Sequence, residues 1–243
     1  MLKKTLAVSL FYGMLTTAAH AEETTTSAPV LITPFTANYT IIHNSKSVGT
    51  ATRALKALDN GQYEYSYHTN IEWLIFSDDR KETSIVTIDN NHVTPLEYKY
   101  KREGTGRDKS SHWLFNVNQS QATNVEKEKT FPIEYPSNVQ DSLSYHLQHR
   151  FNLIKHPKQT HFVYPVVKNE NHIKNYVYQY DGEEEIMLPY GLVKTIKLKR
   201  EVVEKKRVTY AWFAPELNYL LVKLYQVKGG VEQFEAQLNT VSE

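Results

Sequence analysis

The side chains with the clearest potential for chemistry are four histidines that lie close together in the sequence: His146, His149, His156 and His161. Residues three apart on a helix face the same way, so His146 and His149 could share a metal ion with a third ligand from a strand. No His-Glu-x-x-His motif or comparable carboxylate spacing accompanies them. We therefore expect no metal site, and we expect His149 and Arg150 on the solvent-facing edge of a helix.

Serine and aspartate stand together at Asp141-Ser142, with Ser144 two positions later. A nucleophile elbow needs glycine on both sides of its serine, because only then can the strained strand-to-helix turn form. Neither serine has such glycines, and we interpret Asp141 as a carboxylate that binds free backbone N–H groups at a helix start. A hydrolase would require His146, Asp141 and a serine hydroxyl within hydrogen-bond reach. The sequence favours a protein that is not an enzyme.

Composition argues against several other classes of function. The chain has 28 Lys and Arg against 27 Asp and Glu, and these charges are scattered, whereas a nucleic-acid partner requires a concentrated basic face. The absence of cysteine excludes disulfides, thiol catalysis and cysteine metal sites. Gly104-Thr105-Gly106 is interpreted as a hairpin tip, since no helix follows that could bind a phosphate. We expect no cofactor and no nucleic-acid partner.

The first residues have the three parts of a secretory signal peptide. Lys3 and Lys4 give a basic start, residues 5–19 are uncharged, and Ala19-His20-Ala21 has small residues where a signal peptidase reads them. The apolar stretch is too short for a membrane span. We predict cleavage after Ala21, so that the mature chain has no transmembrane segment.

The predicted signal peptide, residues 1–21, indicates export, and an exported chain without cysteine fits the bacterial periplasm. Residues 22–33 contain too few apolar side chains to pack and are predicted to form a flexible leader. Residues 34–243 have the length of a single β-rich domain.

Alternation of apolar and polar residues predicts strands through most of the chain. Strand geometry sends successive side chains to opposite faces, so one face of each strand is apolar and the other solvated. In the clearest strand, Gln62–Trp73, the apolar side comprises Tyr63, Tyr65, Tyr67, Thr69, Ile71 and Trp73. The other strand candidates are Phe35–Ile42, Ser47–Leu58, Thr83–Asp89, Thr94–Arg102, His112–Val117, Thr160–Val167, Tyr176–Tyr180, Val193–Glu201, Arg207–Phe213, Tyr219–Val227 and Val231–Leu238.

Gly and Asn mark expected turns between these strands, because both tolerate the positive φ of tight hairpins. Asp89-Asn90-Asn91, Asp181-Gly182 and Gly229-Gly230 are such signals. Pro215 cannot donate a ladder hydrogen bond and Asn218 is a natural turn residue, so the stretch around them is predicted to be a hairpin corner.

One segment has helical spacing. Val139, Leu143, Leu147, Phe151 and Ile154 recur on one side, and Pro157 ends the pattern. Ser137 followed by Gln140 resembles a capping box. We predict one amphipathic helix at about residues 138–153, with its apolar stripe laid across the sheet.

These elements predict a mainly β fold, with a single strongly curved antiparallel sheet or open barrel of about 10–12 strands and one helix. The chain contains 17 tyrosines, and a buried tyrosine hydroxyl needs a hydrogen-bond partner. These tyrosines could therefore lie either in a dry core or along a partly hydrated concavity. The residues predicted to line a ligand are Tyr63, Tyr65, Tyr67, Trp73, Trp113, Phe115, Leu143, Leu147, Phe151, Tyr210 and Trp212.

Several fragments together resemble a known family. They are Phe35-Thr36-Ala37-Asn38-Tyr39, Gly49, Thr94-Pro95-Leu96-Glu97-Tyr98, Asp141-Ser142-Leu143-Ser144-Tyr145, Leu188-Pro189-Tyr190-Gly191-Leu192-Val193 and the corner through Tyr219. In this order, over almost all of the mature chain, they resemble an exported bacterial family catalogued as domain of unknown function 3108. One departure is Leu221-Val222, since a proline is expected after Leu220. The family's sheet crossed by a helix is similar to the periplasmic lipoprotein-carrier (LolA/LolB-like) half-barrels, which hold acyl chains in an apolar concavity.

The sequence thus favours a non-enzymatic binding protein whose ligand, a lipid, acyl chain or lipoprotein segment, lies between the concave sheet and the helix. The alternative is a cell-envelope assembly factor that binds another protein through exposed sheet edges or the convex face. A hydrolase is the third hypothesis. Fold similarity does not decide among these functions.

Overall fold

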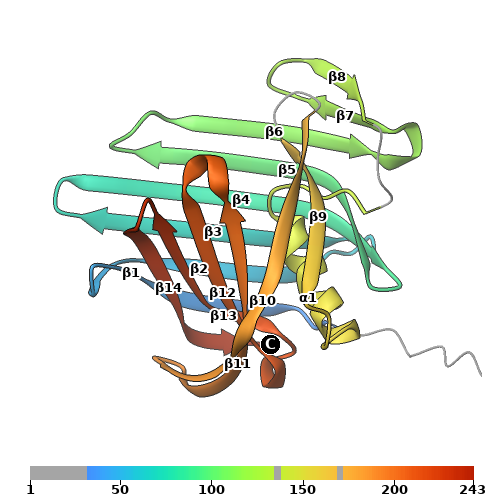
Figure 1. The fold of residues 1–243 in the computed structure, drawn as a ribbon. Helices are drawn as coiled ribbons and strands as arrows, with labels where there is room; N and C mark the ends of the chain where they lie inside the picture. Colours follow the sequence, from blue (N-terminus) through green and yellow to red (C-terminus); the bar gives the residue numbers. More distant parts are fainter. Residues whose placement is uncertain (1–31, 134–137, 169–171) are drawn as a thin grey trace, which may run out of the picture.

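The computed structural model describes residues 32–133, 138–168 and 172–243, so the predicted signal peptide lies outside the described residues. The described chain forms one antiparallel sheet with a single α-helix, α1 (Ser144–Lys155) (Figure 1). The fourteen strands are β1 (Phe35–His43), β2 (Lys46–Ala57), β3 (Tyr63–Trp73), β4 (Phe76–Asp89), β5 (His92–Gly104), β6 (Lys109–Asn116), β7 (Gln121–Asn124), β8 (Lys129–Pro132), β9 (His161–Lys168), β10 (His172–Leu188), β11 (Gly191–Val202), β12 (Arg207–Ala214), β13 (Leu220–Lys228) and β14 (Val231–Ser242). Three short 3-10 turns, η1 (Val117–Gln119), η2 (Val203–Lys205) and η3 (Pro215–Leu217), complete the elements.

The strands follow the order β8-β7-β6-β5-β4-β3-β2-β1-β14-β13-β12-β11-β10-β9. Every neighbouring pair is consecutive in sequence except β1 and β14, which pair antiparallel at the centre. The edges, β8 and β9, do not close into a barrel. The sheet bends instead, so that β9–β13 cross in front of β2–β6 with α1 beside them (Figure 1). The predicted fold class is confirmed.

All twelve expected strands are present, and the two unexpected ones, β7 and β8, have only four residues each. Asp181-Gly182, however, is not a turn. It lies inside β10 at a bulge between Tyr180 and Glu183, where Gly182 has φ 114°. Because a bulge also favours a residue with positive φ, the dipeptide resembles a hairpin signal. It bends a seventeen-residue strand that pairs first with β9 and then with β11.

The predicted corner after β12 is confirmed. The turn η3 begins at Pro215, and Asn218 takes the left-handed conformation, with φ 50°, that ends it. A bulge then places Phe213 opposite Leu221 and Trp212 opposite Lys223. After this bulge, the residues of β13 that face inward change from odd to even positions or the reverse. Simple alternation does not predict such a change within one strand.

The helix begins six residues later than expected. Gln140 is fully buried and extended: its backbone pairs with β9, and its side-chain amide donates to the Val93 carbonyl at 2.7 Å. Ser137, the first residue of the expected capping box, lies outside the described residues. Asp141 and Ser144 take that role, because the Asp141 carboxylate accepts from the Ser144 N–H at 2.7 Å and the Ser144 hydroxyl accepts from the Asp141 N–H at 3.0 Å.

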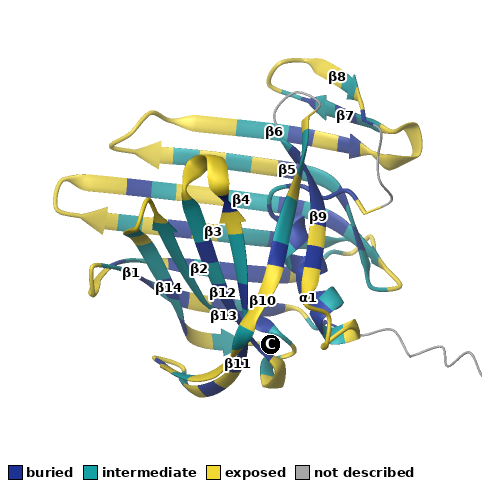
Figure 2. Cartoon of the chain, in the orientation of Figure 1, coloured by how far each residue is buried: buried dark blue, intermediate teal, exposed yellow. Residues whose placement is uncertain are grey.

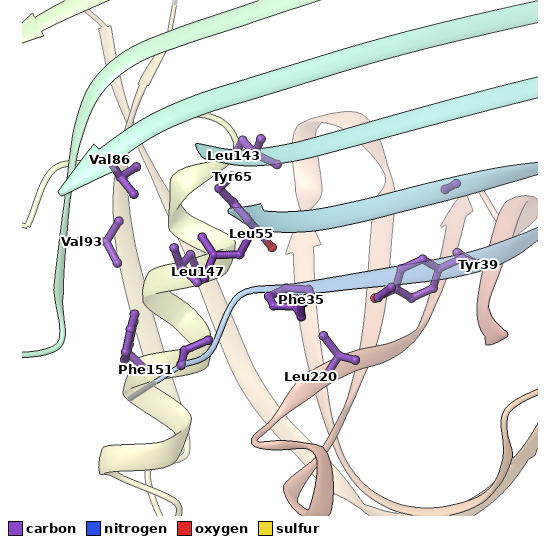
Figure 3. Close-up of a cluster of buried hydrophobic side chains, with 14 of the residues drawn as sticks. Phe35, Tyr39, Leu55, Tyr65, Val86, Val93, Leu143, Leu147, Phe151 and Leu220 are labelled. Carbon is purple, nitrogen blue, oxygen red and sulfur yellow. The ribbon is translucent and has the colours of Figure 1, made fainter. Parts of the chain in front are cut away.

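The apolar stripe of α1 packs against the first half of the sheet as predicted. Leu143, Leu147 and Phe151 are buried and face a cluster that includes Leu55 and Val86 (Figure 3). Figure 2 shows this burial around α1 and the contrasting exposed residues at the outer hairpin ends of β3–β6. The core therefore lies at the helix end of the bent sheet.

The expectation that His149 and Arg150 face solvent is wrong, because α1 is buried on two sides. The opposite side of the helix packs on β9–β12, where the His149 ring lies 4.9–5.1 Å from the ring centroids of Phe162, Tyr164, Tyr178 and Phe213. Neither ring nitrogen of His149 has a hydrogen-bond partner among the residues that the structure describes. Burial lowers the pKa of His149 to about 3, so it is neutral at pH 7.

Arg150 ties α1 to the corner after β12. Its guanidinium donates to the Asn218 carbonyl at 2.7 Å and to the Leu217 carbonyl at 3.0 Å, and it stacks over the Phe35 ring at 4.9 Å. These carbonyls end a turn and have few alternative partners. Arg150, which was expected in solvent, therefore fixes α1 to the corner after β12.

Candidate functional site

A hollow runs along the concave side of the sheet, beyond the end of α1 where Ser142 and His146 lie. It consists of overlapping cavities: an inner cavity of 170 Å³ beside α1, an edge cavity of 480 Å³ between β4–β6 and β9–β11, and a middle cavity of 530 Å³ between β3–β4 and β12–β14. Glu82 lines all three, so they meet around this side chain. We call the three together the hollow.

A fourth, apolar cavity of 340 Å³ continues the hollow toward the β3–β4 hairpin tip. It shares Ile41, Ile71, Phe76 and Phe234 with the middle cavity. Its other lining residues are His43, Val48, Trp73 and Gln233. The concave side thus offers a charged, tyrosine-rich middle joined to an apolar end.

Strand β4 contributes three charged side chains to the lining of the hollow. Asp78, Arg80, Glu82 and Ser84 occupy successive inward positions, where the packed part of the sheet has apolar residues. Asp78 accepts hydrogen bonds from Arg80 at 2.8 Å and from Arg102 at 2.7 Å. Burial raises the pKa of Asp78, but these hydrogen bonds outweigh burial, and its pKa is lowered overall. Asp78 is therefore a charged, fully paired group.

Glu82 and Asp141 are held by neutral donors rather than by cations. The Tyr98 hydroxyl donates to Glu82 at 2.7 Å, and burial raises the pKa of Glu82. Asp141 accepts from the Ser84 hydroxyl and from the Leu143 N–H at 2.7 Å. Burial also raises the pKa of Asp141, against these hydrogen bonds.

The geometry required for a hydrolase is not assembled among the described residues. His146 faces the inner and edge cavities, but no side-chain hydrogen bond joins it to Asp141 or to a serine hydroxyl. Burial and then the charge of Arg53 hold the pKa of His146 well below its ordinary value. The Ser142 hydroxyl instead accepts from Lys168 at 2.5 Å. Within residues 32–133, 138–168 and 172–243, no group of three or more His, Asp or Glu side chains could hold a metal ion.

Arg53 is the most enclosed cation of the hollow. It projects inward from β2 and is 6% exposed, and its guanidinium lies 5.2 Å from the Tyr67 ring centroid and 5.9 Å from that of Tyr65. Its Nε has no hydrogen-bond partner in the described part of the chain. Arg200, from β11, lines the same inner cavity and stacks on the Tyr176 ring at 3.5 Å.

The predicted ligand-lining residues fall into two groups. The residues that line a cavity are Tyr67, Trp73, Trp113, Phe115 and Leu143. The residues that line none of these cavities all belong to the core or pack against it: Tyr63, Tyr65, Leu147, Phe151, Tyr210 and Trp212. Tyr210 and Trp212 alternate with Thr209 and Ala211, which face inward, and so lie on the opposite face of the sheet.

On that outer face Trp212 donates to Glu184 at 2.7 Å, with Lys197 and Lys223 over its ring at 5.3 and 5.0 Å. The prediction of a strand over Arg207–Phe213 was correct, but the alternation of its residues does not say which face of the sheet is concave. Sequence reasoning also missed Arg53, Glu82 and Arg200. The available signal was a charged residue at the inward position between Ala51 and Leu55.

The hairpin tip between β3 and β4 carries two apolar side chains in solvent. Leu74 is 90% exposed and Ile75 94% exposed, and Leu74 has φ 56°, which a branched side chain adopts at a cost. The neighbouring β5–β6 loop braces the tip, where the Thr105 hydroxyl accepts from the Ser77 N–H at 2.8 Å.

Comparison with family models gives a match to the protein family of unknown function DUF3108 over residues 10–234. The chain belongs to the DUF3108 family. A search of curated proteins finds no match to this DUF3108 protein. Among the described residues of the DUF3108 chain, no helix is long and apolar enough to cross a membrane.

Two solved structures are similar to this DUF3108 protein. One is a β-barrel-like protein of the domain of unknown function DUF1849 from Brucella abortus, with 9% identity, a TM-score of 0.55, and coverage of 88% of this chain and 98% of that chain. The other, from Bacteroides fragilis NCTC 9343, is described as a candidate exported protein with a YmcC-like fold. It has 10% identity and a TM-score of 0.34 and covers 86% of this chain and 95% of its own. At these identities the similarity to the DUF1849 protein shows the fold alone.

Proposed function

We propose that this DUF3108 protein binds an amphipathic molecule, such as a lipid, an acyl chain or a lipoprotein segment, in the hollow, without catalysing a reaction. The observation that carries the proposal is the continuity of a charged, tyrosine-rich middle with an apolar end cavity. A ligand with one polar and one apolar end matches that arrangement. Ligand sites commonly have volumes of about 300–1,000 Å³, which is the scale of these cavities.

The apolar part of such a ligand would lie between Ile41, Ile71, Trp73, Phe76 and Phe234, with its polar part toward Tyr67 and Arg53. Burial of hydrocarbon contributes about 0.8 kcal/mol per methylene. A chain of ten carbons therefore has a large driving force even after the entropy lost on binding is subtracted. Tyr39, whose hydroxyl donates to the Leu221 carbonyl at 2.8 Å, keeps its polar group satisfied beside this path.

We also propose that the protein acts in the bacterial periplasm after removal of residues 1–21. The basic start, apolar stretch and Ala19-His20-Ala21 of the sequence support export. The mass of the mature protein purified from a periplasmic fraction tests this: an N-terminus at Glu22 supports the proposal, and a chain that retains Met1 contradicts it.

The binding proposal is tested by titrating the purified protein with a fluorescent fatty acid and by native mass spectrometry after lipid extraction. Ile71 lines both the middle and the apolar cavity, so Ile71→Trp should fill the space and weaken uptake roughly tenfold or more. Leu114→Trp is the matched control, because Leu114 is exposed between the inward-facing Trp113 and Phe115. No uptake by the wild type, or equal loss in both variants, would contradict the proposal.

A second candidate, binding of another envelope protein, is favoured by Leu74 and Ile75 on the β3–β4 tip. Exposed apolar side chains at a strained tip are typical of contact sites. Crosslinking from position 75 should then give one dominant protein product, and Leu74→Ser with Ile75→Ser should remove it while fatty-acid uptake is retained. If the double variant still gives the crosslinked product, the β3–β4 tip is not the contact site.

A further inference from the structure

The positive side chains that face the hollow outnumber the negative ones that face it. Arg53, Lys168, Arg200 and Arg207 all line it, and among the described residues none of the four lies within 4.0 Å of a carboxylate oxygen. A buried or half-buried cation without a counter-charge costs free energy. These four side chains are the feature that the fold itself does not explain.

Tyrosine rings lie close to two of these cations. Arg53 lies beside Tyr65 and Tyr67, and Arg200 lies on the face of Tyr176. Aromatic faces attract a guanidinium but leave its N–H groups free to donate in the ring plane. The unpartnered Nε of Arg53, a side chain that is more than nine-tenths buried, is such a free donor.

The other two cations lie in the adjoining cavities. Arg207 lines the edge and middle cavities, and its Nε is also buried without a partner. Lys168 lines the edge cavity and donates to Ser142, a neutral hydroxyl. The four positive side chains thus surround the connected cavities of the hollow and do not form a single patch on one wall.

The carboxylates of the hollow do not neutralise these cations. Asp78 is taken by Arg80 and Arg102, while Glu82 and Asp141 have neutral donors. Four cations therefore face two carboxylates that are not bound to Arg or Lys, an excess of two positive charges. The whole chain has a formal net charge of only +1, so this excess is local to the hollow.

We infer that the hollow holds an anionic oxygen group of its ligand, a carboxylate or a phosphate, between Arg53 and Arg200, with Lys168 and Arg207 beside it. This inference rests on the proposed function and adds the charge of the ligand. Guanidinium forks bind carboxylate and phosphate oxygens with paired hydrogen bonds. In an enclosed site these bonds are stronger than in water.

The test compares four probes of the same protein: dodecanoate, dodecyl phosphate, the neutral 1-dodecanol, and inorganic phosphate. Binding is measured by isothermal titration calorimetry in the wild type and in Arg53→Met, Arg53→Lys and Arg107→Met. Arg107→Met is the matched control, since Arg107 is an exposed loop residue that lines none of the cavities. Thermal unfolding of each variant establishes that it is folded.

Dodecanoate or dodecyl phosphate should bind the wild type on the order of tenfold more tightly than dodecanol. Arg53→Met should remove that preference, so that the anionic probes bind no more tightly than dodecanol, while Arg53→Lys should retain part of it because the charge is kept. Arg107→Met should behave as the wild type. Arg53-dependent binding of inorganic phosphate would also support the site and would identify a phosphate as sufficient without a chain.

Two results overturn the inference in different ways. If dodecanol binds as tightly as the anionic probes, the anion site is absent while the proposed binding of amphipathic molecules stands. If none of the four probes binds, the proposed function fails and the anion site fails with it. Should Arg53→Met not fold, Arg200→Met carries the same test on the opposite half of the sheet.

Discussion

The helix end and the hairpin end of the concave sheet face use the same strands and differ in almost everything else. On β2 the inward side chain changes from Leu55, which is buried in the core, to Arg53 and Ala51, which line the inner cavity. On β4 it changes from Val86 to Glu82 and Arg80. The inward side chains next to α1 pack against it, whereas the inward side chains farther along the same strands line open space.

This difference shows that a single alternating pattern contains two environments. The α1 side chains end the packed region near Leu143, which contacts both the core and the inner cavity. Beyond it, within the described chain, no helix fills the space between the two halves of the bent sheet, and charged side chains line that space. On each of these strands, the residues near α1 therefore contribute to stability, and the residues farther along line the proposed binding site.

The largest effect should come from the packed region. Phe151 is buried on α1 and lines none of the four cavities described above, so Phe151→Ala should lower the free energy of unfolding by about 3–5 kcal/mol, because a void replaces a well-packed ring. Urea unfolding followed by circular dichroism measures this. A loss below about 1 kcal/mol would mean that the helix end is not packed as described.

The sharpest test of the comparison uses two tyrosines on one strand. Tyr65 is 3% exposed and in the core, whereas Tyr67, two residues on, is half-buried against the hollow. Tyr65→Ala should cost about 3 kcal/mol or more, and Tyr67→Ala about 1 kcal/mol, since only the first leaves a closed void. Equal costs in urea unfolding would show that the two positions share one environment.

A pH effect of about 2 kcal/mol should come from His149. Its pKa is lowered to about 3 in the folded protein, whereas an unfolded chain binds the proton near pH 6.5. The unfolded state therefore gains protons first, so the stability is fully present above pH 6.5 and falls as the pH drops toward 3.

Between pH 7 and pH 5 the wild type should lose about 2 kcal/mol more than His149→Phe, as measured by urea unfolding at both pH values. The phenyl ring keeps the aromatic contacts with Phe162 and Phe213 but cannot bind a proton. An identical pH dependence in the two proteins would contradict the buried, neutral state of His149.

The sequence predicted the class of the sheet because apolar and polar residues alternate in many segments along the chain. It missed β7 and β8 because four residues are too few to establish an alternation. It placed the start of β4 at Thr83, seven residues late. Residues 77–82, Ser-Asp-Asp-Arg-Lys-Glu, are polar on both faces, and no period-two signal exists there. Three residues of that polar stretch, Asp78, Arg80 and Glu82, also line the hollow.

The helix illustrates a second limit. Its apolar stripe was visible, but Gln140, His149 and Arg150 are buried through specific partners that lie far away in sequence. Burial of a polar side chain depends on those partners and not on local periodicity. Likewise, nothing in the alternation of β12 distinguishes the concave face from the convex one.

The pairing of β1 with β14 has a consequence for the order of folding during synthesis. Asn38 on β1 bonds to Thr240 on β14, 202 residues later, whereas every other strand pairs with its neighbour in sequence. While β14 is still missing from a growing chain, β1 and β13 each present an open edge, and open edges recruit other chains. The hollow is completed only when β14 arrives, because Phe234 and Ala236 form part of its wall.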